Sequence, residues 1–147
     1  MSAVVTTVTG AVQPEQLGGT LMHEHVFVQY GGPSAEYCEP GALFDEIIAS
    51  CAACIERIRH WGVQALVDPT TVDLGRNIPL LRALSTHTGF PIVCATGIYS
   101  TDVYRRLRDQ RGGPAAIADL FVQELTGGYE KKIDGALAEK TDELMEV

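Results

Sequence analysis

The sequence has few basic residues and no long apolar run. Its 147 residues include 11 Lys and Arg against 19 Asp and Glu, which gives a formal net charge of −8. A chain this acidic repels phosphate backbones, so we expect no nucleic-acid binding. No apolar run approaches the ~20 residues that a membrane-spanning helix needs, so we expect no membrane association.

The N-terminus also lacks the pattern of a secretory signal. Residues 1–7 show no basic segment followed by a continuous apolar stretch. We therefore expect a cytoplasmic protein whose four cysteines are reduced thiols. With 46% apolar and 20% charged residues, the composition excludes a disordered, collagen-like or disulfide-scaffold chain.

The length suits one ordinary domain, and we expect a single domain over residues 1–147. It is too short for a complete (β/α)8 barrel, which needs roughly 200 residues or more.

The order of predicted elements indicates an α/β fold. Strands alternate with helices along the chain after a short N-terminal hairpin over residues 3–12. The apolar strands are predicted at 20–28, 63–67 and 91–96, and a turn-rich segment at 30–34. Helices are predicted over 42–60, from Pro79 with Asn77 near its cap to Gly89, over 102–110 capped by Thr101, and from Pro114 to Gly127-Gly128. Such alternation implies right-handed crossovers and a parallel sheet covered on both faces.

Cys51 and Cys54 form a CxxC pair within the helix predicted over 42–60. Redox chemistry or half of a zinc site would be the functional interpretations. A redox pair usually sits at a helix N-terminus, and no second pair with zinc spacing follows. We therefore expect Cys51 to pack on the apolar face of the helix, with Cys54 at its border. His60 and His87 lie on predicted helices and are expected at the surface.

His23 and His25 carry the strongest chemical signal. Two residues apart on a strand, their side chains point the same way, and Glu24 points to the opposite face. Paired neutral imidazoles suit zinc or another divalent transition metal. The spacing fits two hydrogen-bonded core histidines equally, and a catalytic zinc needs at least three protein ligands.

The segment Gly19-Thr-Leu-Met-His-Glu-His-Val26 resembles the N-terminal signature of the phosphotriesterase family, in the amidohydrolase superfamily. Three further segments, at 62–71, 73–77 and 89–99, resemble the family's second strand, its following loop, and its third strand and loop. The resemblance implies the first three to four units of a (β/α)8 barrel. It also implies a binuclear metal centre, usually zinc, whose hydroxide attacks an ester, lactone or phosphotriester.

The resemblance also implies roles for single residues. His23 and His25 correspond to two ligands of the more buried metal. Tyr99 falls where lactonase members place a substrate-pocket tyrosine, although an ordinary loop aromatic fits as well. Asp68 and Arg76 match positions that we interpret as structural, a strand-end acceptor and a loop anchor. We assign no catalytic residue.

The family pattern breaks in the tail. Its remaining ligands come from later strands, whereas residues 129–147 form a divergent, charged tail that does not read as a buried strand. Glu139 or Lys140 can be forced into register with the bridging ligand, but their flanking residues do not match. We therefore expect an N-terminal hydrolase fragment that is weakly active or inactive as an isolated chain. The alternative is a non-catalytic half-barrel that binds a metal or a protein partner. Two open sheet edges leave room for a homodimer.

Overall fold

The computed structural model describes residues 3–29 and 35–125. Contacts divide the chain into two compact units, Met1–Tyr99 and Ser100–Val147, and each is described by itself. The expectation of a single domain over residues 1–147 stays a prediction. The predicted turn at 30–34, the Gly127-Gly128 stop and the charged tail, with Glu139 and Lys140, lie outside the described residues.

The first unit opens with the predicted hairpin. Strands β1 (Val5–Thr7) and β2 (Gly10–Val12) pair antiparallel, with Val5 opposite Val12. The Thr7 hydroxyl donates to the Gly10 carbonyl at 2.7 Å and closes the turn. A 3-10 turn, η1 (Pro14–Gln16), follows. The hairpin prediction is therefore confirmed.

Three short parallel strands form the main sheet, in the order β3-β4-β5. They are β3 (Thr20–Leu21), β4 (Ala65–Asp68) and β5 (Ile92–Cys94). Leu66 of β4 lies opposite both Leu21 and Ile92. The hairpin meets the amino end of this sheet, where the Val8 amide donates to the Ile92 carbonyl at 2.9 Å. The predicted parallel α/β arrangement is confirmed, and within the described residues the sheet is not a closed barrel.

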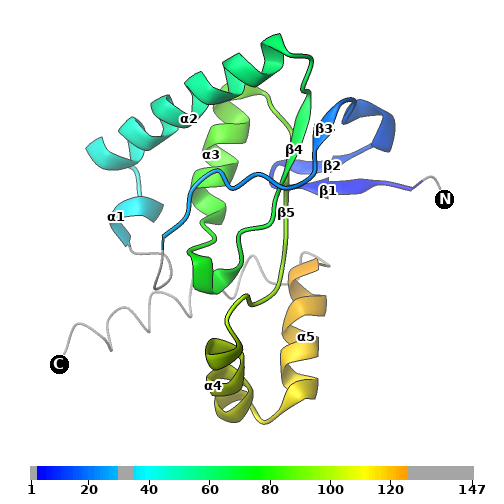
Figure 1. Cartoon of the computed structure of the whole chain (residues 1–147), viewed down its shortest axis with the longest axis vertical. Helices are drawn as coiled ribbons and strands as arrows, with labels where there is room; N and C mark the ends of the chain where they lie inside the picture. The colour runs from blue at the N-terminus through cyan, green and yellow to red at the C-terminus, as the bar shows by residue number, and fades with distance from the viewer. Residues whose placement is uncertain (1–2, 30–34, 126–147) are drawn as a thin grey trace. The chain divides into compact units, whose positions relative to one another are not determined.

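The crossover helices match the sequence expectations closely. Helix α2 (Ala42–His60) has the predicted bounds, preceded by the short α1 (Ala35–Cys38). Helix α3 (Ile78–Thr88) follows the 3-10 turn η2 (Val72–Leu74). The Asn77 side chain caps α3 by accepting the Leu80 amide at 3.0 Å. Figure 1 shows α2 and α3 on the same side of β4 and β5.

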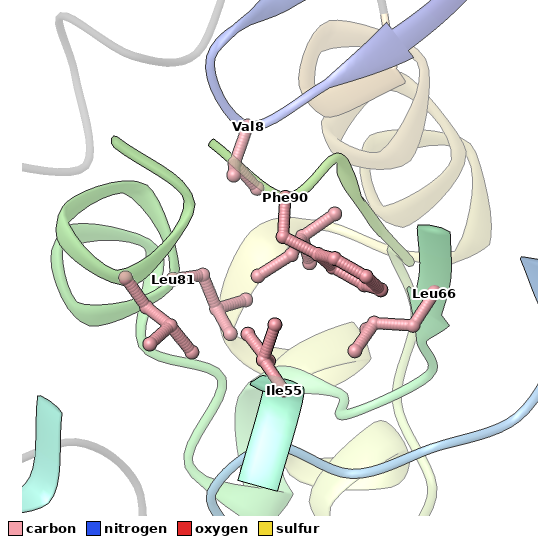
Figure 2. Close-up of a cluster of buried hydrophobic side chains, with 7 residues drawn as sticks. Val8, Ile55, Leu66, Leu81 and Phe90 are labelled. Carbon is pink, nitrogen blue, oxygen red and sulfur yellow. The ribbon is translucent and has the colours of Figure 1, made fainter. Parts of the chain in front are cut away.

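The core of the first unit lies between those two helices and the sheet. Leu66 comes from β4, Ile55 from α2 and Leu81 from α3 (Figure 2). Ile92 of β5 belongs to the same cluster. Phe90, just before β5, is 1% exposed. Val8 and Leu84 complete the buried cluster. Burying each large apolar side chain contributes about 1.5–3 kcal/mol, so this cluster holds the strands in register and thereby positions the loops at their carboxyl ends.

The second unit contains α4 (Thr101–Arg111) and α5 (Pro114–Leu125). The predicted cap of α4 is wrong by one residue. Ser100, with extended backbone, accepts the Val103 amide with its hydroxyl at 3.5 Å, so Thr101 is the first helical residue. Gly112 ends α4 in the left-handed conformation, with φ 91°. Across residues 3–29 and 35–125, no helix is both long and apolar enough to cross a bilayer.

Candidate metal centre

The predicted strand over 20–28 is wrong in its extent, because regular pairing stops at Leu21. A bend at Met22 and His23 follows. The chain nevertheless stays beside β4, since the Glu24 amide donates to the Val67 carbonyl at 3.1 Å. The segment from His23 to Val26, here called the histidine segment, therefore lies at the carboxyl end of the parallel sheet.

The bend changes which residues face the core. Leu21 and Val26 both pack against the buried cluster. They are five residues apart, and an unbroken strand would put residues at an odd separation on opposite faces. The bend thus shifts the alternation by one residue. Val26 is half-buried against the core, whereas His25 beside it is exposed.

The two imidazoles lie side by side, as their spacing predicts. The ring centroids of His23 and His25 are 5.4 Å apart, with the ring planes at 77°. Both side chains are exposed. This arrangement does not match two buried, hydrogen-bonded core histidines, which is the structural alternative that the sequence left open.

Asp68, at the end of β4, ties the histidine segment to the sheet. Its side chain is 1% exposed. One carboxylate oxygen accepts the Val26 amide at 3.2 Å, and the other accepts the Thr70 amide at 2.8 Å. The structure therefore supports the strand-end role expected for Asp68. Arg76, the expected loop anchor, is also buried and donates to the Ala95 carbonyl at 2.9 Å.

The contact between Thr70 and His25 was not predicted from the sequence. The Thr70 hydroxyl lies 2.9 Å from Nδ1 of His25, and Thr70 is 1% exposed. The two residues are 45 positions apart. Their pairing arises because parallel strands bring their carboxyl ends to one edge of the sheet. The only signal in the sequence is that Thr70 directly follows the Asp68-Pro69 strand end.

The cysteines take the packing role expected of them. Cys51 packs against the core, and Cys54 is exposed. The Cys51 thiol contacts the Val26 carbonyl at 3.7 Å, beneath the histidine segment. Burial raises the pKa of the Cys51 thiol, and the neighbouring Cys54 raises it further. A thiol held protonated is a poor metal ligand, since the thiolate is the ligating form.

The remaining candidates lie at the surface. His60 and His87 are exposed, as expected. The Tyr99 side chain is 77% exposed, and its backbone amide donates to the Asp73 carboxylate at 2.9 Å. The described residues do not bring a third His, Cys, Asp or Glu into a cluster that could hold a metal ion. Two imidazoles therefore fit zinc in donor type, but supply only part of the ligand set that a catalytic ion requires.

The parallel strands, the helices that cover them and the two histidines at the carboxyl end of the sheet place this chain among α/β proteins whose functional groups lie at that end. Residues 3–139 match the model of the phosphotriesterase family. The chain belongs to this family, which confirms the resemblance drawn from the residues.

Individual relatives agree with this assignment. A "phosphotriesterase homology protein" of Mycobacterium tuberculosis is 34% identical over 130 residues, which cover 84% of this chain and 40% of that protein. An N-acetyltaurine hydrolase of Tetraodon nigroviridis is 30% identical, with 88% and 44% covered. The solved organophosphorus hydrolase of Deinococcus radiodurans superposes with a TM-score of 0.65 at 36% identity, covering 83% of this chain and 37% of that one. The chain thus spans about two fifths of the length of these relatives.

Proposed function

We propose that the chain is the N-terminal part of a metal-dependent hydrolase, built as the first three to four units of a (β/α)8 barrel. His23 and His25 would supply two ligands to a divalent metal, with zinc as the preferred ion. The observation that carries this proposal is the pair of exposed imidazoles, 5.4 Å apart, at the carboxyl end of the parallel strands. Barrel enzymes place their sites at that end.

The residues around His23 and His25 would position the two imidazoles in such a site. The bend after Leu21 turns both imidazoles away from the core, and Asp68 fastens the histidine segment through the Val26 amide. When bound, a divalent metal supplies Lewis-acid polarisation and lowers the pKa of water. The resemblance implies that the further ligands come from later barrel strands, which the first three to four units do not include.

The proposed substrate is a small ester, lactone or phosphotriester. Supporting it are the relatives named for phosphotriester and organophosphorus hydrolysis. Tyr99 is the proposed substrate contact, because its exposed ring follows the loop after β5, at the same end of the sheet as the histidines. A cytoplasmic location and a homodimer through the open sheet edges stay predictions.

We further propose that these 147 residues, assayed alone, have weak or no hydrolase activity. The described residues bring together two imidazoles and no third ligand. A catalytic zinc takes at least three protein ligands and water. The alternative is a non-catalytic half-barrel that serves only to bind a metal or a protein partner.

Zinc titration of the purified chain, followed by calorimetry, tests the ligand assignment. We expect His23→Ala with His25→Ala to abolish the binding seen in the parent chain. The matched control is His60→Ala with His87→Ala, which removes two exposed histidines elsewhere and should leave binding unchanged. Equal loss in both double variants would refute the assignment.

Hydrolysis of a lactone and of an aryl phosphotriester is measured on the same zinc-loaded samples. We expect rates no higher than those of free zinc at the same concentration. Zinc-dependent turnover well above that level, lost in the His23 and His25 double variant, would overturn the proposed inactivity while supporting the proposed ligands.

A further inference from the structure

Thr70 holds one nitrogen of one histidine. Its hydroxyl lies 2.9 Å from Nδ1 of His25, a hydrogen-bonding distance. The Thr70 side chain is 1% exposed, whereas the His25 ring is exposed. The contact therefore joins a fixed, buried hydroxyl to a ring whose other edge is open.

Asp68 fixes both partners of this contact. One of its carboxylate oxygens accepts the Thr70 amide at 2.8 Å, and the other accepts the amide of Val26, the residue after His25, at 3.2 Å. The same buried carboxylate therefore holds the backbone next to the Thr70 hydroxyl and the backbone next to the His25 imidazole. In the described part of the chain, His23 has no such hydroxyl partner, and its ring contacts the His25 ring.

The direction of the Thr70 bond decides what His25 can do. A neutral imidazole carries one N–H and one lone pair, so the bond made by one nitrogen sets the role of the other. If Nδ1 donates to the Thr70 oxygen, the lone pair stands on Nε2. If the Thr70 hydroxyl donates into Nδ1 instead, Nε2 carries the proton and cannot bind a metal.

We propose that Thr70 is a positioning residue, which accepts the Nδ1–H of His25 and so presents Nε2 as the metal ligand. This inference rests on the proposed function. Metal-binding histidines commonly donate their other ring N–H to an oxygen, which fixes both tautomer and ring orientation. Thr70 acts through His25 and does not itself touch the metal.

The test measures the His25 tautomer in the metal-free chain by long-range 1H–15N NMR. It is done at mildly alkaline pH, where the spectra themselves show that the rings are neutral. We expect His25 as the Nδ1–H form in the parent chain and in Thr70→Ser, which keeps the hydroxyl. In Thr70→Val, which has a similar shape without the hydroxyl, we expect a shift toward the Nε2–H form. His23 is the internal reference and should not change.

Zinc affinity provides a second readout of the same three proteins. We expect Thr70→Val to weaken binding by about 10- to 100-fold, the usual effect of losing such a partner, and Thr70→Ser to restore it. Thermal melts show whether Thr70→Val folds. If it does not, the parent and Thr70→Ser spectra still decide the question.

An Nε2–H form of His25 in the parent chain would overturn the proposal, as would an unchanged tautomer in folded Thr70→Val. These outcomes are separate from failure of the proposed function. If the parent chain binds no zinc, the ligand assignment fails, whereas the tautomer measurement, made without metal, still tests the role of Thr70.

Discussion

Replacing Asp68 tests the claim that one buried carboxylate anchors the histidine segment. Asp68→Asn keeps the shape of the side chain but turns one acceptor oxygen into an NH2 donor. Since both oxygens accept backbone amides, from Val26 and Thr70, one of these N–H groups must then face another donor. Losing a hydrogen bond to a charged group costs about 1.5–3 kcal/mol.

This cost converts into a measurable shift of the melting temperature. The unit that contains Asp68 is Met1–Tyr99. For a domain of that size each kcal/mol moves Tm by about 4–8 °C, so Asp68→Asn should lower it by roughly 6 to 24 °C. Asp68→Ala leaves both amides without an acceptor and should cost more, about 2–6 kcal/mol.

Thermal and urea unfolding followed by circular dichroism would measure both variants. The matched control is Asp119→Asn, which removes the same charge at an exposed position on α5. Such surface changes usually stay within about 0.5 kcal/mol. If both Asp68 variants have the same melting temperature as Asp119→Asn, the Asp68 carboxylate does not hold the histidine segment and the reasoning is wrong.

Two further predictions concern a glycine and a thiol. Gly75 and Gly62 both adopt a left-handed backbone, with φ of 83° and 84°. An alanine at either site should cost about 1–2 kcal/mol for that conformation. Gly75→Ala should cost about 1–3 kcal/mol more, because its Cβ would collide with the Gln29 backbone, while Gly62 faces open space; equal urea midpoints for the two variants would contradict this. For the thiols, tandem mass spectrometry after brief iodoacetamide treatment should find Cys54 modified before Cys51, whose pKa is raised by burial and then by Cys54. Because the folded state disfavours the Cys51 thiolate, its contribution to stability is present below the ordinary thiol pKa and is lost as pH rises through the raised folded-state value. Faster labelling of Cys51 than of Cys54 would contradict the assignment.

Much of the fold could be predicted because the relevant signals are local. The bounds of α2 follow from its apolar periodicity and the Gly62 stop, and α3 from the Asn77 cap and Gly89. The spacing of His23 and His25 similarly anticipated that their rings would be neighbours. Each of these inferences used residues within a few positions of one another.

The errors and omissions involve information that is not local. The strand predicted over 20–28 ends at Leu21 because the packing of both Leu21 and Val26 on one core requires a bend, which composition does not reveal. The partnership of Thr70 with His25 depends on strand pairing across 45 positions. The α4 cap was misplaced because Ser100 and Thr101 are both good capping residues, and only the backbone conformation chooses between them.

The bend between Leu21 and His23 has a consequence for how this segment tolerates insertions and deletions. Adding or removing one residue there would restore the simple alternation that the bend interrupts. Leu21 and Val26 would then face the apolar cluster from an unbroken strand, and both imidazoles would still face away from it. The bend therefore accommodates the odd separation of Leu21 and Val26, and Met22, which is 70% exposed, lies within it.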